Sequence, residues 1–120
     1  MSRAHAFEDL KVWQLARELV RSVYLLTKDA QFGRDQGLRD QIRRAAVSCM
    51  ANIAEGFRKR GKPDKVRFLN IAEGSIEESR YYLILAQDLG NGQTCDLMNS
   101  LEEVSRLINA YSKAILTSDF

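Results

Sequence analysis

The sequence predicts an all-α protein that folds as an antiparallel up-down four-helix bundle. Apolar residues recur at helical spacing through four long stretches, and the only proline among 120 residues is Pro63. Short polar segments containing glycine separate the stretches, and none shows the alternation that is typical of strands. Long helices joined by short loops pack as antiparallel neighbours. We therefore expect one domain over residues 1–120.

Each helix has its own sequence signals. Asp9 and Thr94 are expected N-caps of the first and fourth helices, and Pro63 suits the first turn of the third. Gly56 is expected to end or loosen the second helix. Gly74, in the middle of the third, costs about 1 kcal/mol relative to alanine. A close helix crossing would explain its presence, as would a lack of selective pressure against it. The helices are expected at about residues 9–28, 38–57, 63–89 and 95–116.

The stretch GLRDQIRRAAVSCMANIAEGFRKR, residues 37–60, is the most distinctive part of the chain. Its centre consists of small residues, which allow close packing against more than one neighbour. Polar groups interrupt that centre, and similar groups occur in the third helix. A carboxylate on an apolar helix needs partners. The set is either a polar binding site or, as we favour, a hydrogen-bond network that fixes helix register or subunit contacts. Its members are Ser48, Asn52, Glu55, Glu73 and Ser75.

The charge distribution is uneven, although the net charge is only +2. Residues 39–67 contain nine basic and three acidic residues, whereas residues 68–120 contain eight acidic and three basic ones. Basic side chains cluster at the corner between the second and third helices and again near the start of the second helix, about 30 Å away at 1.5 Å per residue. The corner residues are Arg58, Lys59, Arg60, Lys62 and Lys65, and the distant ones are Arg39, Arg43 and Arg44.

Such clusters are candidate binding sites for the phosphate backbone of RNA or DNA. The alternative is a solvated charged face, which is common at helix ends. Repetition in a ring would turn either cluster into a continuous basic band. Aromatic residues near the corner are few, only Phe57 and Phe68. Base stacking and sequence readout are therefore not expected.

Catalysis and metal binding are not expected from the residue inventory. The only histidine, His5, lies near the start, so the Glu-x-x-His pairs of metal-binding bundles are missing. Cys49 and Cys95 show no metal-ligand spacing, and no phosphate-binding or dinucleotide-binding glycine motif is present. We expect no cofactor. Neither a signal peptide nor a membrane-spanning run of about 18 apolar residues is found, so a cytoplasmic protein with reduced thiols is expected.

Several apolar residues fall on otherwise polar helix faces. Leu25 shares a face with charged residues of the first helix, and Tyr81 and Ile84 do the same in the third. Together with the second apolar side of residues 37–60, they indicate a self-association surface. The alternative is a monomer with scattered exposed apolar residues.

Three segments carry a family resemblance: FEDLKVWQLARELV, the stretch at residues 37–60, and RFLNIAEGSIEES. They resemble the four-helix-bundle proteins encoded in intervening sequences of bacterial 23S ribosomal RNA genes, also called the S23 family. The chain is more distantly similar to accessory proteins of diversity-generating retroelements. The resemblance implies a homo-oligomer, a pentamer in known members, without a catalytic site. Family function is poorly defined, and the retroelement relatives suggest binding of RNA and a reverse transcriptase through a basic surface.

One departure from the family pattern affects the second helix. The family motif has a proline four residues before its alanine-glutamate-glycine, where this chain has Met50. A kink at this point should therefore be weaker or absent.

Two functions remain open from the sequence. The first is a non-enzymatic homo-oligomer that binds nucleic acid through its basic surface. The alternative is a structural adaptor whose oligomer binds a protein partner through Tyr81, Ile84 or the acidic face of the fourth helix.

Overall fold

The computed structural model describes residues 4–29, 32 and 34–118. Within these ranges the chain forms four α-helices and one short 3-10 helix, with no strand, which confirms the predicted all-α class. In chain order the elements are η1 (Phe7–Asp9), α1 (Lys11–Thr27), α3 (Gln36–Arg58), α4 (Lys62–Asp88) and α5 (Cys95–Thr117).

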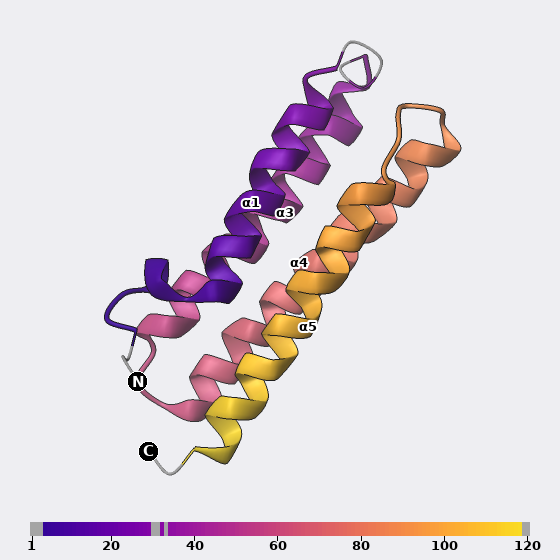
Figure 1. Ribbon diagram of the computed structural model, residues 1–120. Coiled ribbons are helices and arrows are strands. Elements are labelled where there is room, and N and C mark those ends of the chain that lie inside the picture. The colour runs from indigo at the N-terminus through magenta and orange to yellow at the C-terminus, as the bar shows by residue number, and fades with distance from the viewer. Residues whose placement is uncertain (1–3, 30–31, 33, 119–120) are drawn as a thin grey trace.

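The four α-helices lie side by side in an elongated bundle of 49 × 22 × 20 Å (Figure 1). Each helix packs against the next along the chain, and α5 closes the bundle against α1. The closest and longest contact joins α3 to α4. The short η1 contacts both α1 and α3. The predicted up-down arrangement is therefore correct.

The core runs along the bundle axis and takes apolar side chains from every α-helix. In α5 the apolar residues Leu97, Leu101, Val104 and Ile108, which recur at helical spacing, are buried. Burial of one such aliphatic side chain contributes roughly 1.5–3 kcal/mol. The largest fully buried side chains include Leu19, Phe32, Ile42, Ile53, Leu69, Ile76, Leu83, Leu101 and Ile108.

The start of the first helix differs from the prediction. The helix begins at Lys11, and Leu10 rather than Asp9 is its N-cap. The Asp9 carboxylate instead accepts hydrogen bonds from the backbone N–H groups of His5 and Ala6, at 3.0 and 3.2 Å. Because the Asp9 carboxylate is already bonded to the preceding turn, it stabilises η1 and does not cap α1.

The second helix starts earlier and ends later than predicted. Asp35 caps it, since its carboxylate accepts the Leu38 N–H at 3.0 Å. The helix then continues without interruption to Arg58, so the expectation that Gly56 ends it is wrong. Gly56 is instead buried in the contact with α4.

Gly74 is not at a close helix crossing, so the first of the two explanations for this glycine is wrong. A Cβ atom at this position would have no neighbour within 4 Å. Thr94 does occupy the N-cap position of α5, but its hydroxyl donates to Gln87 Oε1 at 2.8 Å instead of capping the helix. It ties the end of α4 to the start of α5.

Candidate nucleic-acid interface

The turn from α3 to α4 lies at one end of the bundle, the end at which α5 also finishes (Figure 1). Six basic residues lie in or beside this turn. Only one acid, Asp64, interrupts residues 58–67. We call this group the basic corner; it comprises Arg58, Lys59, Arg60, Lys62, Lys65 and Arg67.

Two lysines of the basic corner also hold the fold together. Lys65 Nζ donates a hydrogen bond to the Phe57 carbonyl at 2.7 Å, which satisfies an otherwise unpaired group at the end of α3. Partial burial lowers the pKa of Lys65. Lys62 Nζ donates to the carbonyl of Ser118 and so fastens the end of α5 to the corner. These lysines are tethered in place but still add positive charge.

Two cations of the basic corner lie over the ring of Phe68. Lys59 Nζ is 4.7 Å and Arg67 Cζ is 5.0 Å from the centre of its ring, which is the geometry of cation–π contacts. Arg67 was missing from the predicted site, although it lies within the same run of basic residues. Arg67 also forms an exposed ion pair with Asp64, at 3.6 Å, which contributes little to stability.

Arg58 and Arg60 are the most available cations of the corner. Both side chains are exposed, and within the described residues neither makes an ion pair or a hydrogen bond. Their guanidinium groups are therefore open to a phosphate, which they can bind with two parallel N–H donors.

The three basic residues near the start of α3 are placed differently. Arg43 Nε donates to the Thr27 hydroxyl at 2.8 Å, and its guanidinium lies 4.4 Å from the centre of the Tyr24 ring. Arg39 contacts Asp40 at 3.1 Å.

Arg44 ties α3 to α4. It forms an ion pair with Glu78 at 2.5 Å and donates to Gln41 at 3.0 Å. The hydrogen bond with Glu78 raises the pKa of Arg44. The cations at this end of α3 thus have hydrogen-bond or ion-pair partners in the chain, unlike Arg58 and Arg60. The structure therefore puts the two predicted basic groups at opposite ends and gives them different surroundings.

The predicted polar set separates into different places. Ser75 Oγ donates to Ser48 Oγ at 2.9 Å, across the α3–α4 contact. Asn52 Nδ2 donates to the Ser48 carbonyl at 2.8 Å and lies 3.2 Å from its hydroxyl oxygen. Ser79, which the prediction omitted, donates to the Ser75 carbonyl at 2.9 Å. These residues form a small network between two closely packed helices.

The two carboxylates lie outside this network. Glu73 faces α5 and accepts a hydrogen bond from the Ser105 hydroxyl at 3.0 Å. Partial burial raises the pKa of Glu73. Glu55 is exposed, and within the described residues no hydrogen bond joins it to Ser48 or Asn52. Within one protomer Glu55 therefore lies apart from this network, at the surface beside Arg58, and its role in subunit contacts stays a prediction.

Comparison with known proteins places the fold in a family. Residues 8–110 match the family described as 23S rRNA-intervening sequence protein. The chain belongs to that family. A crystal structure from Bacteroides thetaiotaomicron VPI-5482, described as a protein with unknown function from the S23 ribosomal protein family, is 24% identical. It superposes with a TM-score of 0.77 over 85% of this chain and 98% of that one, which shows a shared fold. No protein of curated function matches the chain.

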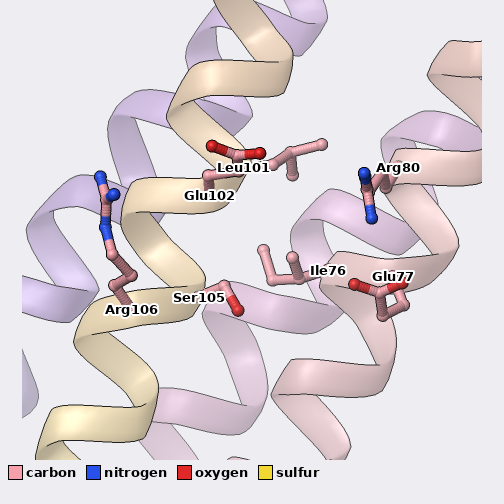
Figure 2. Close-up of a pocket in the computed structure, with 7 residues that line it drawn as sticks. All are labelled: Ile76, Glu77, Arg80, Leu101, Glu102, Ser105 and Arg106. Carbon is pink, nitrogen blue, oxygen red and sulfur yellow. The ribbon is translucent and has the colours of Figure 1, made fainter.

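This intervening-sequence family member also has a hollow of about 280 Å³ between α4 and α5. Figure 2 shows Ile76 of α4 and Ser105 of α5 extending toward each other, with acidic and basic side chains around them. The two acids and two bases are Glu77, Glu102, Arg80 and Arg106. Because these charges balance, the hollow does not favour an anion.

The described residues of this family member give three further results. No group of three or more histidine, cysteine, aspartate or glutamate side chains is arranged to hold a metal ion. None of the helices described is both long and apolar enough for a bilayer crossing. Burial raises the pKa of the Cys49 thiol to about 12, so this cysteine remains protonated inside the bundle.

Exposed apolar residues occur where the sequence predicted them. Leu25, Tyr81 and Ile84 have exposed fractions of 68%, 55% and 45%. Val47 of α3 and Ile71 of α4 are also exposed, on helices that contact each other closely. The chain therefore presents apolar surface outside its core.

Proposed function

We propose that this protein is a non-enzymatic homo-oligomer in the cytoplasm that binds the phosphate backbone of RNA or DNA through the basic corner. One observation carries the proposal. Arg58 and Arg60 are exposed and unpaired within the described residues, beside four further cations. Exposed cations with few acids nearby attract phosphates and release the counterions of the nucleic acid.

The opposite end of the bundle makes a poorer phosphate site. Arg43 and Arg44 contact groups within the chain, and Arg39 contacts Asp40. The preceding segment alternates charges, with Asp29 and Asp35 on either side of Arg34. The structure therefore favours the basic corner over the second group of predicted residues.

Self-association would multiply the corner. The exposed apolar residues of α3 and α4 support an interface between copies, and the family resemblance suggests a pentamer. In a closed ring every protomer has the same orientation relative to the ring axis, so equivalent corners form a ring. Several weak phosphate sites on one particle bind a long strand more tightly than one site does.

Fluorescence anisotropy with labelled RNA and DNA duplexes tests the proposed binding. Arg58→Gln/Arg60→Gln should weaken binding of both duplexes, because two unpaired cations are lost. Lys28→Gln/Arg34→Gln removes two exposed charges from the opposite end and serves as the matched control. Equal binding by the corner variant and the unmodified protein would contradict the assignment.

A protein-binding adaptor is the second candidate. Tyr81 and Ile84 are exposed on α4, and large exposed apolar side chains are common at protein interfaces. Light scattering, which measures the oligomeric state, separates the two candidates when it is combined with the RNA and DNA binding assay. An oligomer that binds neither RNA nor DNA favours the adaptor.

A further inference from the structure

A second feature of the basic corner is a hollow of about 360 Å³ beside the cations, within the usual range of small-molecule sites, roughly 300–1,000 Å³. Three elements meet there: the end of α3, the start of α4 that follows it, and η1, which is distant from both in sequence. Its walls are mainly apolar, and charged groups stand at its edge. The lining residues are Phe7, Ala54, Glu55, Arg58, Lys59 and Phe68.

The two aromatic rings of the hollow are held in place by their surroundings. Phe7 packs edge-on against Trp13, with ring centres 4.9 Å apart. Phe68 lies under Lys59 and is backed by Gly56, at which a Cβ atom would come within 3.1 Å of the Phe68 Cβ. Both rings are therefore positioned by contacts made without a ligand.

The charges at the edge indicate what the hollow would receive. Arg58 and Lys59 attract the phosphates of a strand passing over it, whereas Glu55 repels a phosphate that enters it. A nucleobase is uncharged and flat, stacks on aromatic rings, and can donate from an amino group to a carboxylate such as Glu55. The combination favours a base inside and the backbone outside.

We propose that this hollow receives one unpaired nucleobase of a strand whose phosphates bind Arg58 and neighbouring cations. The proposal rests on the proposed nucleic-acid binding and adds a preference for unpaired nucleotides. In a duplex the bases are stacked and paired, so only the phosphate contacts remain available. The protein would then bind single-stranded extensions or unpaired loops more tightly than continuous duplex.

Two oligonucleotides with equal numbers of phosphates test this preference. One is an RNA duplex with a short single-stranded extension, and the other has abasic nucleotides in that extension. Fluorescence anisotropy should show roughly tenfold tighter binding of the extension that carries bases, the size expected for one stacked base.

Ala54→Leu fills the hollow without changing charge, and leucine is compatible with a helix. It should remove the preference for bases and leave binding of the abasic duplex unchanged. Ala110→Leu is the matched control on exposed α5 surface, and it should retain the preference. Phe68→Leu, which removes one ring, should also reduce the preference.

Equal affinity of the unmodified protein for the two extensions would overturn the base-binding inference and leave backbone binding intact. The same holds if Ala54→Leu keeps the preference. If neither oligonucleotide binds at all, the proposed function fails as well. Because the comparison of extensions needs only the unmodified protein, it remains decisive even if a variant fails to fold.

Discussion

Gly56 of α3 faces Phe68 of α4 at a distance that leaves little room for a side chain at residue 56. A Cβ atom there would lie 3.1 Å from the Phe68 Cβ and 3.4 Å from the Lys65 carbonyl oxygen. Neither atom belongs to the mobile end of a side chain, so both move only with the backbone. The contact thus sets the spacing of the two helices beside the basic corner.

Gly56→Ala should destabilise the protein by about 1–3 kcal/mol, the usual cost of overpacking, although alanine favours helix. Gly74→Ala is the comparison, because a Cβ atom there meets nothing within 4 Å. It should stabilise by about 0.5–1 kcal/mol. Urea unfolding checks both, and a stabilising Gly56→Ala would show that α4 can shift away.

Ser75→Ala should cost about 1 kcal/mol, because it removes the hydrogen bond to Ser48 in the α3–α4 contact. Ser75→Leu should cost more, about 1–3 kcal/mol, since Ser75 is buried between the helices. Ser22→Ala, at an exposed position on α1, is the control. Thermal unfolding measures all three, and a neutral Ser75→Leu would contradict close packing at this point.

Glu73→Gln tests the pH dependence of stability. Burial raises the folded-state pKa of Glu73, Glu77 adds to the rise, and the bond from Ser105 opposes it. The folded protein therefore binds this proton more tightly than the unfolded chain, and stability falls as pH rises between the two pKa values. The glutamine variant avoids this loss and should be more stable at pH 7, by less than about 1 kcal/mol because the side chain is partly solvated.

The difference between Glu73→Gln and the unmodified protein should disappear below about pH 4, where the carboxyl group is protonated in both states. Urea unfolding at several pH values shows whether it does. A difference that stays constant with pH would mean that the charge of Glu73 is not its cause.

Arg43→Gln and Arg58→Gln should have opposite effects on folding and binding. Arg43→Gln loses the hydrogen bond to Thr27 and the contact with Tyr24, so it should destabilise by about 1 kcal/mol and leave RNA affinity nearly unchanged. Arg58→Gln should weaken RNA binding and leave stability nearly unchanged. Urea unfolding and RNA anisotropy, measured on both variants, check this. Weaker RNA binding by Arg43→Gln, or a stability loss in Arg58→Gln, would contradict the two roles.

Periodicity predicted the helices and their buried stripes because burial follows helical spacing closely in this chain. In α5, for example, the buried residues Leu97, Leu101, Val104 and Ile108 are three or four positions apart. Local capping was less predictable, since Asp9 had two possible uses and the sequence does not rank them. Gly56 and Gly74 look alike in sequence, yet only the first meets a neighbouring helix.

The site was predicted in part for a similar reason. The basic residues at the α3–α4 turn are close together in sequence, so the sequence alone was enough to predict that they form a cluster. Which cations are engaged within the chain depends on tertiary partners, as Arg44 with Glu78 shows. The approach of Phe7 to Phe68 joins opposite parts of the chain, and no local pattern indicates it.

The dependence of RNA binding on salt tests most directly whether the basic corner contacts phosphates. We predict a linear fall of the logarithm of the binding constant with the logarithm of salt concentration. Its slope should become shallower by nearly one for each phosphate contact that Arg58→Gln/Arg60→Gln removes, and Lys28→Gln/Arg34→Gln should leave it unchanged. An unchanged slope in the corner variant would contradict the account.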